Sequence, residues 1–311
     1  MRCARTEVPE TLLNTQLRLD FFQRNFTKEV MQEVKKITFC GDDGDPIYTT
    51  DLIQIIKHLK TMNKDIQIVI VTNGSYKDAM WWRKLGMLMG EQDVIHFSLD
   101  GWDQKSNEQY RVGSDWESIC VGIDAMIKSK AYVVWDAIAF KFNENMIHIM
   151  KEMAKNKGFD KFQLTLSTKF GSFYPRYGEN DPLEPSSKLV STTNRFQRQV
   201  TYFTNRDDYG KRDTTKYYMN TPVENGVKPL CRIGSKGLFI NSRGEFYPCC
   251  WVANRYAHND DWQGKFSLYE RSLPDILQDD FWDNEFKTFK WYECQTKCKS
   301  SEVTLETASE W

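Results

Sequence analysis

The sequence predicts an α/β fold with a parallel sheet, followed by a small, separate cysteine-rich domain. Two observations lead to this prediction. Between residues 36 and 170, short apolar runs alternate with segments of helical periodicity, which is typical of repeated strand-helix units. In the last third of the chain, five of the eight cysteines form a pattern typical of a metal cage: Cys231, Cys249, Cys250, Cys294 and Cys298.

Five strands are expected in the first domain, each a short apolar run bounded by turn residues. They cover residues 36–40, 66–71, 94–99, 132–140 and 162–166. The segments between them carry apolar residues at helical spacing, as in the stripe that contains Leu52 and Ile56. The third helix is expected to begin at a capping box in residues 114–117, and the fourth to end at Gly158.

Residues 171–229 hold five of the nine prolines and no clear periodicity, so we expect a connector there, with a short helix near residues 194–203. After the connector, residues 237–241 and 245–247 are expected to form a β-hairpin. Residues 273–289 are expected to be helical. The hairpin would bring Cys231 and Cys249 toward the same end.

The balance of 42 basic and 43 acidic residues gives no net field to attract nucleic acid. No apolar run is long enough to span a membrane, so we expect a cytoplasmic protein without membrane contact. In that reducing compartment, cysteines serve as metal ligands or core thiols rather than disulfides. Cys40 and Cys120 are expected to be core thiols, and none of the four histidines has ligand spacing to another.

Three successive strand ends carry small polar and glycine-rich sequences, at residues 41–46, 72–75 and 98–101. In parallel α/β sheets, ligands bind outside the carboxyl ends of the strands. Such loops offer backbone amides and carbonyls to a ligand with amino, carboxylate and ribose groups. Taken singly, each is also a common tight turn between a strand and a helix.

With these features the chain resembles the radical S-adenosylmethionine (SAM) superfamily, specifically members with a C-terminal SPASM or twitch extension. In that family a C-x3-C-x2-C motif holds a [4Fe-4S] cluster with one open iron. Cys3, followed by Ala-Arg-Thr, looks like the third cysteine of the motif. The resemblance therefore implies a partial (β/α)6 TIM-like barrel that lacks its first strand here, with the other two cysteines upstream of Met1.

The resemblance also implies which residues bind SAM. Residues 41–46 resemble the family's G-G-E-P stretch, whose backbone meets the SAM amino group, although an aspartate replaces the glutamate. The later loops would approach the methionyl part and the ribose. Arg111 would meet the SAM carboxylate, or else be a solvated arginine near a helix. The implied cofactor-binding residues are Gly41, Asp42, Asp43, Gly44, Asp45, Asn73, Ser75, Ser98, Asp100 and Arg111.

The C-terminal cysteines resemble the family's C-x9-15-G-x4-C pattern, because Cys231 precedes Gly244 and Cys249 at that spacing. Cys294 and Cys298 would complete a four-thiolate site for one auxiliary [4Fe-4S] cluster suited to electron transfer. Cys250 remains an alternative to Cys249. The alternative is a structural zinc held by four cysteines, because its tetrahedral thiolate geometry tolerates similar loop spacings.

We therefore expect a radical SAM-like partial barrel at 1–170, a connector at 171–229 and a SPASM/twitch-like domain at 230–311. The family cleaves SAM reductively to a 5′-deoxyadenosyl radical, which abstracts hydrogen from a peptide or small-molecule substrate, with flavodoxin or ferredoxin as reductant. With Cys3 alone, the chain as written is expected not to cleave SAM. The alternative is a non-enzymatic, zinc-stabilised module that binds a nucleotide or a protein.

Overall fold

The computed structural model of the protein describes residues 15–41, 44–166, 181–186, 199–204, 238–248, 253 and 264–281. The chain divides into two compact units. The first contains the described residues between 34 and 204. The second contains residues 15–33 together with the described residues between 238 and 281.

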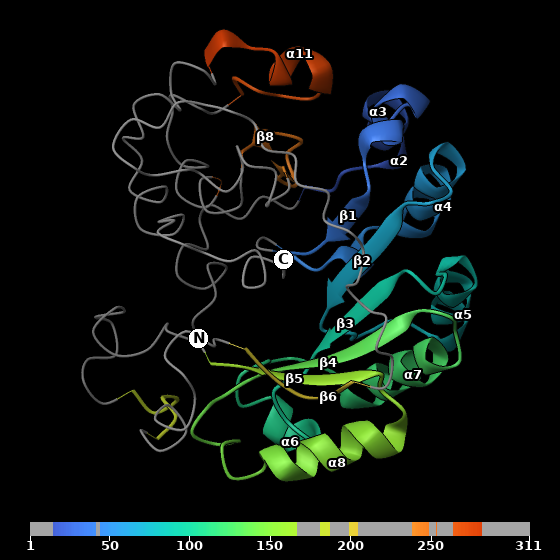
Figure 1. The fold of residues 1–311 in the computed structure, drawn as a ribbon. Helices are drawn as coiled ribbons and strands as arrows, with labels where there is room; N and C mark the ends of the chain where they lie inside the picture. Colours follow the sequence, from blue (N-terminus) through green and yellow to red (C-terminus); the bar gives the residue numbers. More distant parts are fainter. Residues whose placement is uncertain are drawn as a thin grey trace. The chain divides into compact units, whose positions relative to one another are not determined.

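The first unit is built on a six-stranded sheet with the strand order β1-β2-β3-β4-β5-β6 (Figure 1). Strands β1 to β5 are parallel, and β6 pairs antiparallel with β5. The elements are β1 (Lys36–Phe39), η2 (Pro46–Tyr48), α4 (Leu52–Met62), β2 (Gln67–Thr72), α5 (Ala79–Leu88), β3 (Val94–Ser98), α6 (Gln104–Asn107), α7 (Trp116–Ile127), β4 (Tyr132–Ile138), α8 (Ile147–Lys157), β5 (Lys161–Thr165) and β6 (Gln199–Thr204).

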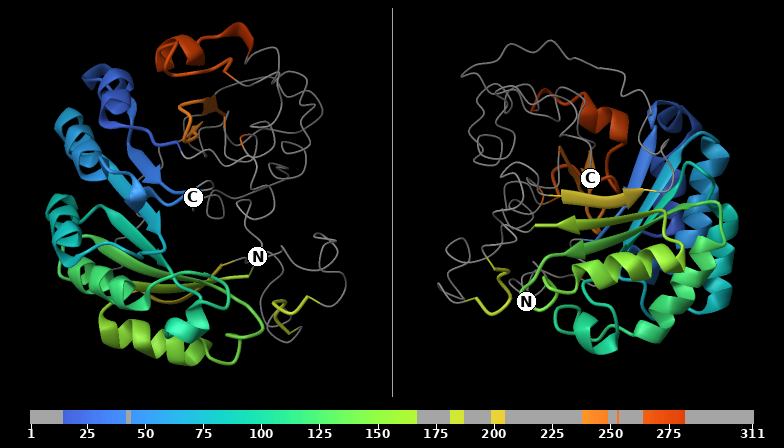
Figure 2. Two further views of the ribbon diagram at one scale, coloured as in Figure 1. Left: turned by 180° about the vertical axis from the view of Figure 1, so that it is seen from behind. Right: turned by 60° about the horizontal axis from the view of Figure 1, so that its bottom comes forward.

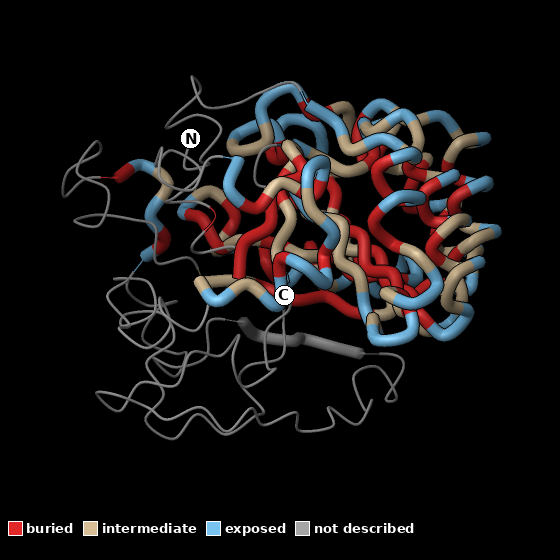
Figure 3. The backbone as a smooth tube through the Cα atoms, turned by 90° about the horizontal axis from the view of Figure 1, so that it is seen from above, coloured by how far each residue is buried: buried red, intermediate tan, exposed pale blue. Residues whose placement is uncertain are grey.

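Helices α4, α5, α7 and α8 cover one face of this sheet (Figure 2). On that face Phe97 contacts Trp82 of α5, and Trp135 packs against Phe162. Side chains alternate along a strand, so the neighbours of these residues point to the opposite face. There an apolar cluster of Val69, Val94, Tyr132 and Val134 crosses three strands. Most residues of the central strands are therefore buried, as the red segments of the tube in Figure 3 show.

Helices α5 and α7 approach each other closely because one position has no side chain. A Cβ atom at Gly122 of α7 would lie 2.6 Å from the Trp82 ring. Trp82 is fully buried, and burying a side chain of this size contributes about 3 kcal/mol. The glycine thus permits the packing of a large aromatic residue between the two helices.

The expected α/β fold with its parallel sheet is confirmed: all five strands form, and Gly158 caps α8 with a φ of 98°. The helix expected near residues 194–203 is wrong, because residues 199–204 form β6. The segment Gln-Val-Thr-Tyr-Phe-Thr is rich in β-branched and aromatic residues, which favour a strand that can pair with β5.

Two smaller expectations are also wrong. The N-cap of α7 is Asp115, whose carboxylate accepts a hydrogen bond from the Ser118 amide, so the capping box starting at Ser114 does not form. The Ser114 hydroxyl instead accepts a hydrogen bond from Asn107. Cys40 is exposed because it follows the end of β1, so it is not a core thiol.

The second unit contains α2 (Leu19–Asn25), α3 (Lys28–Glu33), β7 (Phe239–Ile240), β8 (Phe246–Tyr247) and α11 (Leu273–Leu277). Strands β7 and β8 form the expected hairpin. The Phe21 ring of α2 packs against Tyr269, with ring centroids 5.1 Å apart. Residues 15–33, expected in the first domain, therefore group with the C-terminal part. The domain boundaries themselves stay a prediction.

Helix α11 is shorter than the predicted segment 273–289. It ends at Leu277, and the Asp279 carboxylate accepts a hydrogen bond from the Phe281 amide. Aspartate side chains that bond a nearby amide in this way compete with helical hydrogen bonding. Residues 282–289 lie outside the described part of the chain.

Candidate functional site

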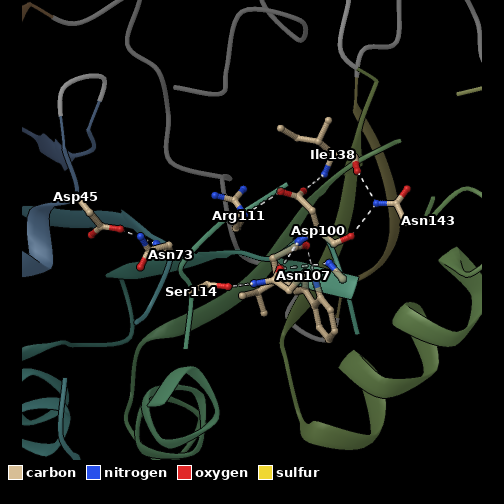
Figure 4. A network of polar contacts seen from close by, with 11 residues as sticks. Asp45, Asn73, Asp100, Asn107, Arg111, Ser114, Ile138 and Asn143 are labelled. Carbon is tan, nitrogen blue, oxygen red and sulfur yellow. Dashed lines mark hydrogen bonds and ion pairs between the residues drawn. The ribbon is translucent and has the colours of Figure 1, made fainter. Parts of the chain in front are cut away.

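The loops after β1, β2 and β3 meet at the carboxyl edge of the sheet, because these strands are parallel neighbours in register. Each loop contributes one polar residue to the arrangement in Figure 4: Asp45, Asn73 and Asp100. The sequence prediction that successive strand ends supply one site is consistent with this arrangement.

Asp45 connects the first two of these loops. Its carboxylate accepts hydrogen bonds from the Asn73 amide at 2.6 Å, from the Thr72 hydroxyl at 2.8 Å and from the Ile47 amide at 3.2 Å. Asn73 in turn accepts a hydrogen bond from the Ser75 amide at 2.9 Å. Burial raises the pKa of Asp45, and these hydrogen bonds oppose the rise. The Asp45 side chain is thus committed to holding the two loops together.

Glycines set the course of the backbone in these loops. A Cβ atom at Gly41 would lie 1.7 Å from the Gly44 carbonyl oxygen, and one at Gly101 would lie 2.2 Å from the Asn107 amide. Gly74 has a φ of +79°, a conformation that residues with a Cβ rarely adopt. Glycine at these positions therefore allows the loop backbone to pack closely where a side chain would collide with it. Asp42 and Asp43 lie outside the described residues.

Asp100, directly beyond β3, is the centre of the polar network in Figure 4. Its fully buried carboxylate accepts a hydrogen bond from the Ile138 amide at 2.6 Å and forms an ion pair with Arg111 Nε at 2.8 Å. Its amide donates to Asn107 at 3.0 Å, and its carbonyl accepts from Asn143 at 2.8 Å. All four polar groups of Asp100 are thus engaged.

The positive charge of Arg111 offsets the free-energy cost of burying the ionised Asp100 carboxylate. Burial raises the pKa of Asp100, and the nearby Asp136 carboxylate raises it further, whereas Arg111 and the Ile138 amide lower it. The Arg111 side chain remains 21% exposed, and its only ion pair with a described residue uses Nε. Its two terminal nitrogens are thereby available to an external anion.

The two predicted serines play different parts. Ser75 is fully buried, and its hydroxyl accepts a hydrogen bond from the Asp115 amide at 3.3 Å, which connects the β2 loop to the start of α7. Ser98 is half-buried at the end of β3 and makes no hydrogen bond to a described side chain. Ser98 is therefore the more accessible of the two.

Sequence reasoning missed the asparagines that support Asp100. Asn107 lies in α6 and Asn143 in the turn after β4, and both are fully buried. A buried asparagine at a strand end is a signal that a loop is being held by side-chain hydrogen bonds. Their spacing from Asp100, 7 and 43 residues, has no local pattern that could reveal the contact.

The second unit holds the hairpin that precedes Cys249. Glu245 accepts hydrogen bonds from Asn241 at 2.6 Å, Arg243 at 2.9 Å, Tyr247 at 3.2 Å and the Gly264 amide at 3.2 Å. Burial raises the pKa of Glu245, but the hydrogen bonds and the positive charge of Arg243 outweigh it, so the net pKa is lowered. The Glu245 carboxylate therefore joins the turn and β8 of the hairpin to the segment at Gly264.

The surroundings of Gly244 explain why the C-x9-15-G-x4-C pattern has a glycine at this position. Its φ is +75°, and a Cβ atom there would lie 2.7 Å from the Tyr269 ring and 2.8 Å from the Phe21 ring. Both the turn and the close packing therefore require glycine.

The predicted metal ligands lie outside the described residues: Cys3, Cys231, Cys249, Cys294 and Cys298. Among the residues that are described, no group of three or more His, Cys, Asp or Glu is placed to hold a metal ion. No described helix is long and apolar enough to cross a bilayer. The cysteine geometry thus stays a prediction, supported by the ordered hairpin beside Cys249.

Comparison with known proteins gives a family match for the C-terminal part and a similar solved structure for the fold. Residues 231–300 match the SPASM family, described as an iron-sulfur cluster-binding domain. The fold is similar to that of SuiB from Streptococcus suis bound to S-adenosylmethionine, with a TM-score of 0.56 and 13% identity over 91% of this chain. The chain therefore shares the fold of this solved structure, and its residues 231–300 carry the match to the SPASM family.

The radical SAM fold is seen again in a second comparison. The structure of anSMEcpe with bound AdoMet and Cp18Cys peptide matches with a TM-score of 0.52 and 16% identity, over 89% of this chain and 77% of anSMEcpe. The present chain spans 64% of the SuiB chain. Among curated proteins, no match was found. The resemblance drawn from the cysteine and strand-end patterns is confirmed.

Proposed function

We propose that this protein is part of a radical SAM enzyme that binds SAM at the carboxyl ends of β1 to β3. The observation that carries this proposal is the set of three glycine-containing loops at the sheet edge, of which Asp45 joins the first two and Asp100 ties the third to Ile138 of β4 and to Arg111. When bound, a [4Fe-4S] cluster and SAM supply one-electron cleavage of SAM and hydrogen abstraction from the substrate. The protein contributes binding, orientation and exclusion of water.

Different residues of the chain would bind different parts of SAM. The backbone of residues 41–44 would meet the SAM amino group, and Asn73 and Ser75 would shape the loop toward the methionyl part. The backbone at Ser98 would lie toward the ribose. The terminal nitrogens of Arg111 would bind the SAM carboxylate, because a guanidinium offers paired donors that match a carboxylate. Asp100 is a positioning residue, since its buried ion pair fixes Arg111 through Nε.

The SPASM domain would hold one auxiliary [4Fe-4S] cluster through Cys231, Cys249, Cys294 and Cys298. Four thiolates saturate such a cluster and suit it to electron transfer rather than to substrate binding at an iron. We infer a cytoplasmic protein, because reduced thiolates persist there, and a flavodoxin or ferredoxin as the electron donor. Replacing Cys249 by alanine should abolish the cluster, whereas replacing Cys250 should leave it intact.

We further propose a peptide substrate. SuiB in complex with its precursor peptide SuiA has a TM-score of 0.54 to this chain, over 93% of this chain and 66% of SuiB. The anSMEcpe structure also contains a peptide. The competing candidate is a zinc-stabilised binding module, which the four-cysteine pattern alone would equally permit.

The test of this proposal is 5′-deoxyadenosine formation under reductant. The assay uses a polypeptide that contains a complete C-x3-C-x2-C motif. We expect 5′-deoxyadenosine in the parent and at least a tenfold rise in the SAM concentration needed for half-maximal rate after Arg111→Met. Asp124→Asn, in an exposed ion pair with Lys157, is the matched control. No product from the parent with its clusters loaded would contradict the proposal.

A further inference from the structure

A row of polar residues crosses the sheet on the face away from the helices. Ser98, Asp136 and Gln163 are register partners on the adjacent parallel strands β3, β4 and β5. Paired residues on neighbouring strands point to the same face. Trp135, next to Asp136, packs on the helix side against Phe162, so the row faces the opposite way.

His96 fixes the middle of this row. It precedes Ser98 by two residues on β3, and its Nδ1 lies 2.6 Å from Asp136 Oδ2. The contact orients the carboxylate so that its other oxygen, Oδ1, is turned away from His96. His96 is thus a positioning residue for Asp136.

Two acceptor atoms in this row have no partner. Asp136 Oδ1 and Gln163 Oε1 are both buried, and neither accepts a hydrogen bond from the residues that the structure describes. Gln163 is only 3% exposed. Buried polar atoms are nearly always paired, because an unpaired one loses its hydration without compensation. Two such atoms on adjacent strands indicate a place where a ligand completes the hydrogen bonding.

The chemistry of the row defines the ligand. A carboxylate oxygen, an amide carbonyl oxygen and the Ser98 hydroxyl are all acceptors, and the carboxylate adds a negative charge. An ammonium group has three N–H donors and a positive charge, so it matches both the number of acceptors and the charge. Lys161 is buried two residues before Gln163, but it has an interaction of its own.

We propose that Ser98, Asp136 and Gln163 form a binding site for a primary ammonium group of the substrate, such as a lysine side chain or a peptide amino terminus. This inference rests on the proposed function in one respect, namely that the bound ligand is the substrate of the enzyme. The site lies at the same strand ends as the SAM loops, since Ser98 is two residues before Asp100. The site would favour a positively charged group of the substrate, near the carboxyl edge of the sheet where hydrogen abstraction would occur.

Binding is tested on the chain as it exists, without iron or SAM, so the outcome is independent of any radical SAM activity. The probe is Nα-acetyl-lysine N-methylamide, titrated while the His96 ring signals are followed by NMR. We expect saturable shifts with the lysine probe and none with the norleucine or Nε-acetyl-lysine analogue. Asp136→Asn should weaken binding at least tenfold, and Asp124→Asn should leave it unchanged. Equal shifts with all three probes, or none with any, would overturn the proposal.

Thermal stability gives a second, ligand-free readout. Gln163→Met keeps the volume of the side chain and removes the unpaired amide, so it should raise the melting temperature while abolishing probe binding. A site built for a ligand commonly lowers stability in this way. A fall in melting temperature together with retained probe binding would show that Gln163 has a purely structural role and would overturn its place in the site.

Discussion

At the scale of single residues, the ion pair between Asp100 and Arg111 decides how the strand-end site is built. The carboxylate has no exposed surface, and the guanidinium is partly exposed. One residue therefore anchors the other: Asp100 is held by the Ile138 amide, and Arg111 is held by Asp100. The negative charge of the buried Asp100 carboxylate is neutralised by Arg111, and the terminal nitrogens of Arg111 remain available to a ligand.

Asp100→Asn tests this anchor. The amide keeps an acceptor for the Ile138 amide but removes the charge opposite Arg111, and breaking a buried pair in this way costs about 3 kcal/mol. Asp124→Asn, whose pair with Lys157 is exposed, should cost less than about 1 kcal/mol. Urea denaturation of both variants measures the difference. Equal losses would mean that the Asp100 pair contributes no more than a surface contact.

Gly244 and Gly264 provide a matched pair for a second residue-scale prediction. Their φ angles are +75° and +77°, but only Gly244 has neighbours where a Cβ would be placed. Gly264→Ala should cost about 1 kcal/mol, from backbone strain alone. Gly244→Ala should cost about 3 kcal/mol, because the Tyr269 and Phe21 rings must also move. Denaturant titrations compare the two, and an equal cost would show that the aromatic packing is loose.

The sequence could indicate these residues only in part. The glycine-rich strand ends and the Gly244 spacing were visible, because glycine is locally informative. The partners of Asp100 and Asp136 were not, since Arg111, Asn143 and His96 reach them from distant points in the sequence. Asp45 and Asp100 accept hydrogen bonds that hold the loops in place, and their part in binding SAM stays a prediction.

At the scale of elements, the hairpin of β7 and β8 is organised around one carboxylate. Glu245 lies between the two arms and the segment at Gly264, and it also forms a β-bridge with Ser267. The phenol of Tyr247 donates to the same carboxylate, and its pKa is raised by burial and by that negative charge. The hairpin therefore depends on Glu245 being ionised.

Glu245→Gln tests this dependence through pH. The folded-state pKa of Glu245 lies below the value of 4.5 for the free side chain, so its stabilisation is complete above that pH and is lost as the pH falls through the folded pKa. The variant should be less stable at neutral pH, by about 2 kcal/mol, and its stability should vary less with pH in the acid range.

Glu270→Gln, at an exposed position in the same unit, is the control for this experiment. It should keep the acid profile of the parent protein. If Glu245→Gln also kept that profile, the ionised carboxylate would not be the group that stabilises the hairpin.

Elements with a strong local pattern were predictable, and those that depend on distant pairing were not. The five parallel strands follow from apolar runs such as residues 94–99. Strand β6 is not predicted because it lies within the expected connector and depends on antiparallel pairing with β5, which no local pattern reveals. The hairpin was found because its turn residues, 242–244, have a clear sequence signature.

At the scale of the whole molecule, the chain consists of a sheet unit and a cysteine-bearing unit. Helices α2 and α3, from the N-terminal part, belong to the second unit together with the hairpin. The SPASM match begins at Cys231 and extends to residue 300. Under the proposals above, SAM and the row of Ser98, Asp136 and Gln163 belong to the sheet unit, and the auxiliary cluster belongs to the segment that matches the SPASM family.

The most direct test of this account is the metal content of the chain after anaerobic reconstitution with iron and sulfide. We expect about four iron and four labile sulfide per chain, with the Mössbauer spectrum of a [4Fe-4S] cluster. Cys294→Ala should remove the cluster, and Cys120→Ala, at a half-buried cysteine on α7, should retain it. A chain that binds only zinc, or that keeps its iron in Cys294→Ala, would contradict the account.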